Sequence, residues 1–360
     1  MLIFILLFVG LLPCAFGEDT WTGVDRVVAV GDVHGDYDAF VAVLRAAEVL
    51  DSKGRWSGAK THLVQTGDVL DRGPDSRKAM DLLMSLEKQA SKAGGRVHAL
   101  IGNHEAMNMY GDLRYADPGE FAAFKTVDSA RFRAALWEEQ VKALASKPDE
   151  AYKKKWEEEH PLGWYEHRLA FSPKGECGKW ILSHNSVIKI NDSLYVHGGI
   201  APAYLSMSIS EMNKAILAEL NNFSKLRPDG IVMGSDGPLW YRGLAQGTAD
   251  LLAAHVDKAL ETYGVKRIVI GHTPVPGLVV PRFGSKVLMI DAGMAAAYNM
   301  GRAALILENN EVYALHRTQR VKLPANMDDY VEYLKKALVD EPNPAGIQRL
   351  IKEAEDRQSK

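Results

Sequence analysis

The sequence predicts an α/β protein in which strands and helices alternate and the functional residues follow the strands. One pattern recurs: an apolar run is followed by Gly together with Asp, Asn or His. It occurs at residues 26–35, 62–73, 96–105, 193–199 and 266–273, and more weakly at 286–293. Alternating strands and helices favour layered α/β packing, and open α/β sheets carry their chemistry in loops beyond the carboxyl ends of strands.

Three helices are indicated by apolar residues spaced for one helical face. The first and second follow the first two strands, and the third ends at Gly264, a residue suited to a helix C-terminus. The apolar faces are Phe40, Val43, Leu44 and Ala47; Met80, Leu83 and Leu86; and Leu252, Val256, Ala259 and Tyr263. Later apolar runs lie closer together, at residues 278–280, 287–290, 304–307 and 312–315, and predict a partly antiparallel second half.

Two stretches depart from this alternation. Residues 106–180 are rich in Ala, Lys, Glu and Trp, and we expect them to form a helical insert or cap over the site. Residues 321–360 are charged, and we expect a docked helix at 326–339 followed by a loose polar end.

The bulk properties are those of a globular, exported protein. The chain has 360 residues, of which 47% are hydrophobic and 25% charged, enough for a substantial core. A formal net charge of −3 argues against nucleic-acid binding. Residues 1–17 are almost wholly apolar and end in a small-x-small pattern, which predicts a signal peptide cleaved after Gly17 and entry into the secretory pathway or export. Cys177 would then be a lone, inert thiol, since Cys14 leaves with the leader.

Polar side chains at the predicted strand ends form a set suited to metal ions. Carboxylate, imidazole and amide ligands together suit Mn, Fe or Zn, and two such ions about 3.5–4 Å apart polarise phosphoryl groups in many enzymes. Asp68 has two oxygens with which to bridge two ions. The set is Asp32, His34, Asp68, Asn103, His104, His197 and His272. The remaining histidines lack this setting and are interpreted as ordinary core or surface residues.

The motifs GDVHG, GDVLDRG, GNHE, HGG and GHT, in this order, resemble the signature of the phosphoprotein phosphatases, which are calcineurin-like metallophosphoesterases. The resemblance covers residues 24–320. GNHEAMNMYGDLRY and GPLWYRG are more narrowly similar to the Shewanella-like protein phosphatase branch.

This resemblance implies an α/β/β/α sandwich of mixed sheets with a helical insert, and a role for each site residue. The first metal would be held by Asp32, His34 and Asp68, and the second by Asp68, Asn103, His197 and His272. Arg72 and Arg242 would bind the phosphate oxygens, to which Asn103 and His104 are also close. His104 would protonate the leaving oxygen, Asp71 would orient its ring, and metal-bound hydroxide would attack phosphorus.

The implied function is hydrolysis of phosphate monoesters on phosphoproteins, with phosphotyrosine and phosphoserine or phosphothreonine both open. A dinucleoside-tetraphosphate hydrolase shares the dimetal core and is the second enzyme reading; a secreted binding module that keeps the fold is the non-enzyme one. The family's S-A-P-N-Y stretch is replaced by DAGMAAAY at 291–298. Asp291 is either a partner of a metal-site histidine or a strand-end turn residue, and Tyr241 either touches substrate or packs.

Overall fold

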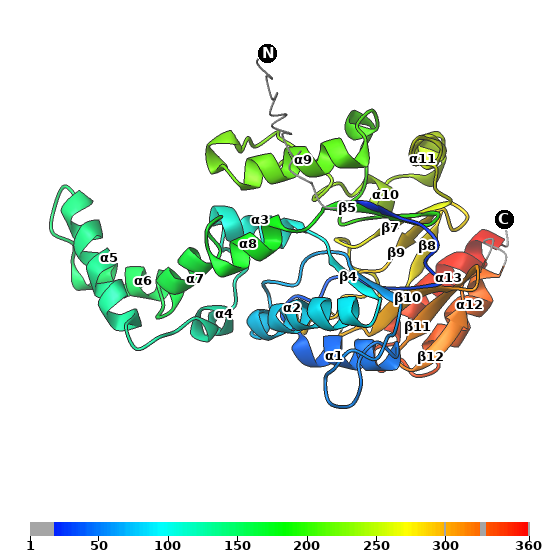
Figure 1. Ribbon diagram of the computed structural model, residues 1–360, viewed down its shortest axis with the longest axis horizontal. Coiled ribbons are helices and arrows are strands. Elements are labelled where there is room, and N and C mark those ends of the chain that lie inside the picture. The colour runs from blue at the N-terminus through cyan, green and yellow to red at the C-terminus, as the bar shows by residue number, and fades with distance from the viewer. Residues whose placement is uncertain (1–17, 299, 325–328, 359–360) are drawn as a thin grey trace, which may run out of the picture.

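The computed structural model describes residues 18–298, 300–324 and 329–358, and its core is a sandwich of two six-stranded sheets with helices on both outer faces (Figure 1). The expected signal peptide lies outside these residues. Within the described ranges, every helix is too short or too polar to cross a bilayer.

The first sheet joins parallel strands from the N-terminal part to antiparallel strands from the C-terminal part. Its order is β12-β11-β10-β2-β3-β4, and β2, β3 and β4 are parallel. Val30, Gln65 and Ala99 lie side by side, so these three strands end at the same level and present their following loops at one edge. The strands are β2 Arg26–Val30, β3 His62–Gln65, β4 Arg96–Ala99, β10 Ala303–Glu308, β11 Glu311–His316 and β12 Gln319–Lys322.

The second sheet has the order β1-β5-β6-β7-β9-β8. Its central strands β6, β7 and β9 are parallel, and Val196, Ile270 and Met289 lie level at their carboxyl ends. β5 runs antiparallel to β6 and parallel to β1, and β8 runs antiparallel to β9, so the expectation of a partly antiparallel second half is confirmed. The strands are β1 Thr20–Trp21, β5 Val187–Ile190, β6 Ser193–Val196, β7 Arg267–Ile270, β8 Val280–Arg282 and β9 Val287–Met289.

Alternating side chains divide the apolar interior into layers, because successive residues of a strand face opposite sides of a sheet. On β2, Val27 and Ala29 pack between the two sheets, whereas Val28 and Val30 pack against the helices outside the first sheet. The core between the sheets includes residues of both, and a third cluster joins the second sheet to α9 and α11. The predicted α/β/β/α sandwich is therefore confirmed.

The helices that cover the sheets include the three that the sequence predicted. α1 begins after Asp36, whose carboxylate accepts a hydrogen bond from the Ala39 backbone N–H, and α11 ends before Gly264, which has a left-handed φ of 58°. These elements are α1 Tyr37–Ala46, α2 Ser76–Lys92, α9 Ile209–Leu220, α10 Gly243–Gln246 and α11 Ala249–Tyr263, with short 3₁₀ turns at Pro202–Tyr204 and Phe223–Lys225.

The predicted insert is helical, but its outer part does not cap the site. α5 and α6 project away from the sandwich as an arm (Figure 1). Trp156 of α6 packs 5.2 Å, centroid to centroid, from Trp137 of α5, so the arm's aromatic side chains are used within the arm. The helices are α3 Asn103–Tyr110, α4 Pro118–Ala123, α5 Ser129–Ala143, α6 Glu150–Glu159, α7 Trp164–Ala170 and α8 Glu176–Leu182.

The C-terminal segment forms two helices, α12 Tyr330–Leu338 and α13 Ala345–Gln358. The start expected for the first, residue 326, falls in 325–328, outside the described residues. The prediction of a loose polar end was wrong, because α13 buries Ile347 and packs Leu350, Ile351 and Ala354 against the core between the sheets. These four residues have helical spacing, which gives an otherwise charged segment one apolar face.

Candidate metal centre and phosphate site

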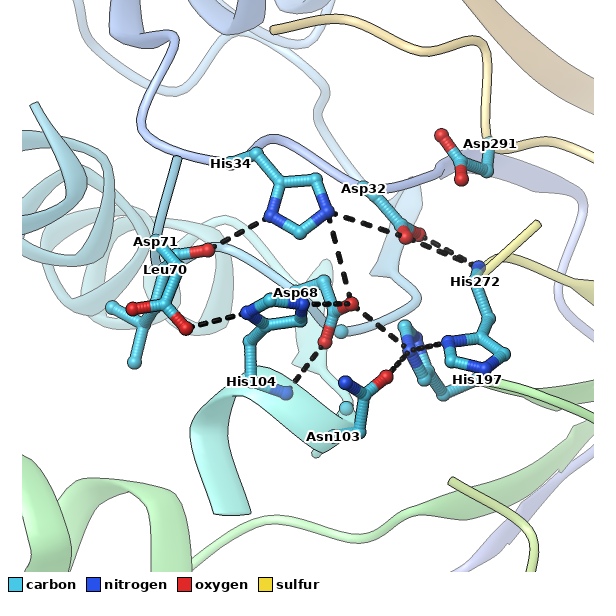
Figure 2. Close-up of polar contacts among 12 residues, drawn as sticks. Asp32, His34, Asp68, Leu70, Asp71, Asn103, His104, His197, His272 and Asp291 are labelled. Carbon is cyan, nitrogen blue, oxygen red and sulfur yellow. Dashed lines mark hydrogen bonds and ion pairs between the residues drawn. The ribbon is translucent and has the colours of Figure 1, made fainter. Parts of the chain in front are cut away.

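The site lies where the carboxyl ends of strands from both sheets meet. Asp32 and His34 follow β2, Asp68 follows β3, and Asn103 and His104 begin α3 after β4. His197 follows β6 and His272 follows β7 in the other sheet. Figure 2 shows these side chains converging around Asp68, as the sequence predicted.

The loops reach this geometry through left-handed backbone at several residues that are not glycine. His34, Asp68, Asp71, Arg72 and His272 have φ between 49° and 69°. Such conformations are costly for residues with a Cβ and collect at functional sites. Contacts described below compensate for this cost around Asp68.

In the first half of the site, the His34 ring faces two carboxylates. Its Nε2 atom lies 3.9 Å from Asp32 Oδ2 and 3.8 Å from Asp68 Oδ2. Its Nδ1 lies 2.9 Å from the Leu70 carbonyl oxygen and must therefore donate to it, since the carbonyl only accepts. The Nε2 lone pair consequently faces the carboxylates, and burial lowers the pKa of His34 to about 3, which keeps that lone pair free of a proton.

The second half brings four acceptor atoms together. His197 Nε2 lies 3.2 Å from Asp68 Oδ2, 2.9 Å from Asn103 Oδ1 and 3.1 Å from His272 Nδ1. His197 Nδ1 donates to the Thr66 carbonyl at 2.9 Å, and His272 Nε2 is 3.2 Å from the Trp240 carbonyl. Both inward nitrogens thus present lone pairs.

This donor set fits a bound cation. Two imidazole lone pairs, a carboxylate oxygen and an amide oxygen within hydrogen-bond distance repel one another unless a positive charge lies among them. The ligand atoms of Asp68, His197 and His272 all lie within 4.8 Å of each other, as do those of His34, Asp68 and His104. Although burial opposes it, the neighbouring His197 and His104 hold the pKa of Asp68 well below its usual value, so its carboxylate is charged.

A further carboxylate adjoins the first half-site. Asp291, after β9, is fully buried beside Asp32 (Figure 2), and its Oδ1 accepts from the Gly293 backbone N–H at 3.0 Å. Its Oδ2 lacks a hydrogen-bond partner among the described residues. Burial, together with Asp291 and Asp68, raises the pKa of Asp32 well above its usual value, and a cation would relieve this concentration of negative charge.

His104 lies between Asp68 and Asp71 in a geometry suited to donating a proton. Its Nδ1 is 2.5 Å from Asp71 Oδ2, and its Nε2 is 3.7 Å from Asp68 Oδ2. Burial opposes protonation, but Asp68 and Asp71 together raise the pKa of His104 above its usual value. Distances alone also permit His104 as a ligand of the first half-site; the short bond to Asp71 favours the proton-donor role that the resemblance implied.

Two arginines approach the centre from opposite sheets. Arg242 is held by its Nη1, which donates to the His272 carbonyl at 2.7 Å and to Thr273 Oγ1 at 3.0 Å. Arg72 packs its guanidinium 4.4 Å from the Tyr115 ring and 5.3 Å from the Tyr298 ring, and its buried Nε has no hydrogen-bond partner among the described residues. A guanidinium held by stacking, with N–H groups to spare, is suited to binding an oxyanion.

Comparisons with known proteins agree with this geometry. The model of the calcineurin-like phosphoesterase family matches residues 25–276.

The chain belongs to the calcineurin-like phosphoesterase family.

Its relatives include the Shewanella-like branch of these phosphoesterases. Shewanella-like protein phosphatase 2 of Arabidopsis thaliana is 30% identical over 295 residues, covering 75% of this chain and 72% of the relative. An uncharacterised protein of Schizosaccharomyces pombe is 35% identical over 310 residues, covering 82% of each. The crystal structure of a cold-active protein-tyrosine phosphatase from a psychrophilic Shewanella species has a TM-score of 0.68 and 30% identity, covering 86% of this chain and 83% of that one. The chain therefore has the calcineurin-like phosphoesterase fold and is a phosphoester hydrolase.

Two residues of this phosphoesterase support the site and were not singled out from the sequence. Glu105 is fully buried and accepts from the backbone N–H groups of Asp68, Val69 and Gly102, each at 2.8 Å, which stabilises the left-handed turn at Asp68. A Cβ on Gly102 would lie 2.3 Å from Asp68 Oδ1, so glycine is required there. The GNHE motif contained the signal, because a Glu three residues into a helix is placed to reach back to its start.

Asn108 is the second, one helical turn after His104. Its Nδ2 donates to Asp71 Oδ1 at 3.0 Å and to the His104 carbonyl at 3.0 Å, so Asp71 is held between His104 and Asn108. Arg168, from α7 at the base of the arm, donates to the carbonyls of Asn108 and Met109 at the end of α3. The insert therefore braces the helix that carries His104.

The other sequence predictions are resolved by packing. Tyr241 packs: its backbone and ring approach Gly198, Gly199 and Gly243 so closely that a Cβ there would meet them. Asp291 lies beside Asp32 and accepts its hydrogen bond from the backbone of Gly293. Among the described residues, the candidate metal groups include none of the histidines interpreted as ordinary: His62, His98, His160, His167, His184, His255 and His316.

Proposed function

We propose that this phosphoesterase hydrolyses phosphate monoesters on phosphoproteins and prefers phosphotyrosine. The observation that carries the proposal is the convergence of four acceptor atoms, which suit a cation, beside His104 and two arginines; a cation and two guanidiniums together would bind a dianionic phosphate. The Shewanella relative, described as a protein-tyrosine phosphatase, adds support for the substrate class.

Mn, Fe or Zn ions are the proposed cofactors, since mixed carboxylate, imidazole and amide ligands suit them. One ion would be held by Asp32, His34 and Asp68, and another by Asp68, Asn103, His197 and His272. Bound there, the ions would supply a hydroxide nucleophile and positive charge toward the phosphoryl oxygens.

The chain's own residues bind the phosphate and move a proton. Arg72 and Arg242 offset the phosphate charge, and Asn103 also contacts the phosphate. His104 donates its Nε2 proton to the leaving oxygen, because its Nδ1–H is already directed at Asp71. General acid catalysis of this kind contributes about 10²–10⁴-fold to the rate.

A pocket beside His104 supports an aryl substrate. It has a volume of about 550 Å³ and its walls include Met107, Tyr110, Trp240 and Tyr115. The Tyr115 ring lies 5.3 Å from the ring of His104, and Arg242 also lines the pocket, so its wall adjoins the proposed proton donor. An aromatic ring leaving His104 would stack against these side chains, whereas a serine side chain would leave them exposed.

The experiment is a comparison of substrates on metal-loaded protein. Phosphotyrosine and phosphoserine peptides with identical flanks, diadenosine tetraphosphate and p-nitrophenyl phosphate are offered in parallel. We expect the highest kcat/KM among the biological substrates on phosphotyrosine, a loss of that advantage in Tyr110→Ala, and no change in Tyr152→Ala, a matched exposed tyrosine on the arm. Faster hydrolysis of diadenosine tetraphosphate than of the peptides would favour a dinucleoside-tetraphosphate hydrolase. A protein that binds metal but hydrolyses none of these substrates would favour a binding module.

We further propose that the partners are phosphoproteins rather than nucleic acids, and that the leader directs the chain into the secretory pathway or out of the cell. Expression of the full chain with a C-terminal tag tests the latter. Recovery of uncleaved protein in the cytosol alone would contradict it.

A further inference from the structure

A second hollow includes in its wall Tyr298, whose ring lies 5.3 Å from the Arg72 guanidinium. It has a volume of about 740 Å³, and its lining is mainly apolar: Pro274, Pro276, Tyr298, Met300, Pro342 and Pro344. The Arg72 guanidinium lies between two tyrosine rings, and each ring lines one hollow: Tyr115 the pocket beside His104, and Tyr298 this groove. Each hollow therefore has in its wall a tyrosine that contacts Arg72, which we propose binds the phosphate.

The groove's walls are extensions of the catalytic loops. Pro274 and Pro276 follow His272 by two and four residues, and Tyr298 lies 5.6 Å from the ring of His34. The Val275 backbone N–H donates to the Asp291 carbonyl at 2.8 Å, which fixes the loop to the strand end. The groove therefore adjoins the site, because the loop after His272 and the side chain of Tyr298 contribute to its walls.

The C-terminal segment supplies the opposite wall. Gly346, near the start of α13, approaches Pro276 so closely that a Cβ there would lie 2.4 Å from the proline Cβ. Glu341 anchors the segment before it through an ion pair with Arg317 at 3.3 Å. This gives the C-terminal helices a role beyond covering the sandwich.

The chemistry of the groove selects its occupant. Proline has no backbone N–H, so the four prolines offer no donors to an added strand, and side chains must supply most of the contact. Met300 is half exposed, and its flexible thioether adapts to varied apolar shapes. Among the rim residues, Arg349 is paired with Glu353 at 3.7 Å, which leaves little net charge to attract an ionic side chain.

We propose that this groove receives an aliphatic or proline side chain of the phosphoprotein substrate, from a residue close in sequence to the phosphorylated one. An extended peptide advances about 3.3 Å per residue, and Tyr298 of the groove wall lies 5.3 Å from the Arg72 guanidinium, so the side chain in the groove comes from a residue near the phosphorylated one. The inference rests on the proposed phosphatase function and adds a sequence preference to it.

The test uses phosphotyrosine peptides that differ at one flanking position at a time, from four before to four after the phosphotyrosine, with Leu, Pro, Asp or Lys. We expect one or two positions at which Leu or Pro raises kcat/KM about tenfold over Asp, since burying such a side chain has an effect of this order. Met300→Asp and Ala345→Asp each place a carboxylate on the groove, so in these variants a peptide with Lys at that position has a higher kcat/KM than one with Leu or Pro.

Two controls separate this inference from the function on which it rests. Leu251→Asp changes another exposed apolar residue, on α11 and outside the groove, and leaves the peptide preference intact. p-Nitrophenyl phosphate does not reach the groove, so its hydrolysis stays within about twofold of wild type in all three variants. The groove proposal is overturned if the enzyme shows no preference at any flanking position, or if Met300→Asp and Ala345→Asp leave the preference unaltered. The phosphatase proposal is overturned instead if the wild-type protein does not hydrolyse p-nitrophenyl phosphate.

Discussion

Replacing Asn108 by Leu removes the hydrogen bond that holds Asp71 while leaving the metal ligands and His104 in place. Asn108 Nδ2 lies 3.0 Å from Asp71 Oδ1, and Asp71 uses its other oxygen for His104 at 2.5 Å. Leu keeps the branching of Asn at Cγ and leaves no cavity, and the same substitution at a second buried Asn controls for its larger volume.

The expected magnitude follows from the charge of the acceptor. A buried hydrogen bond to a charged group contributes about 1.5–3 kcal/mol. If all of it serves to orient His104 in the transition state, its loss slows turnover about 10- to 100-fold. The loss depends on the leaving group, because an alkoxide needs the proton from His104 and a nitrophenolate hardly does.

The assay is kcat on a series of phosphate monoesters with leaving groups from alkyl alcohols to dinitrophenol. We expect Asn108→Leu to lose about 10- to 100-fold on alkyl esters and under about threefold on dinitrophenyl phosphate, with metal content unchanged. Asn213→Leu is the control, because Asn213 is also buried and hydrogen-bonded to the backbone of Ser186 and Val187, away from the site. An equal loss on all esters, or the same pattern in Asn213→Leu, would refute the positioning role.

Three further predictions concern single side chains. His104→Asn keeps its metal by elemental analysis but loses about 10²–10⁴-fold in kcat on alkyl esters; unchanged turnover rules out the proton-donor role. Burial lowers the pKa of His167 to about 3 from 6.5, so between these pH values the unfolded chain holds more protons and stability rises with pH. In His167→Leu, the free energy of unfolding in urea should therefore change less steeply with pH between pH 7 and 5. The slope should fall by up to about 1.4 kcal/mol per pH unit below pH 6.5. A slope equal to that of wild type would contradict the assignment of His167 as a buried neutral histidine. Burial raises the pKa of Cys177 to about 12, so a thiol reagent at pH 8 should label it only after unfolding; rapid labelling of the native protein would show otherwise.

The convergence of the site was predictable because the sequence places polar residues directly after apolar runs. Parallel strands that end level bring such residues to one edge, as Val30, Gln65 and Ala99 do here. The roles of the arginines and of His104 were implied by the family resemblance, and the assays above test the role of His104.

The residues that hold the ligands were harder to predict. Glu105 stabilises the Asp68 turn through three backbone N–H groups, and Asn108 reaches Asp71 across 37 positions of sequence. Such contacts depend on how α3 packs against the loop after β3, which single-sequence patterns do not specify. The same holds for the direction of α5 and α6, whose apolar residues pack on one another, and for α13, whose one apolar face was outweighed by its charges.

The most direct test of the account is the metal content of the purified protein measured together with its phosphatase activity. We predict two ions of Mn, Fe or Zn per chain and p-nitrophenyl phosphate hydrolysis that is lost on chelation and restored by added metal. Asp68→Asn, which alters the one carboxylate shared by both halves, should lower both the metal content and the activity. The account would be contradicted if the metal-free wild-type protein hydrolysed the ester as fast as the metal-loaded protein. It would also be contradicted if Asp68→Asn retained both ions and full activity.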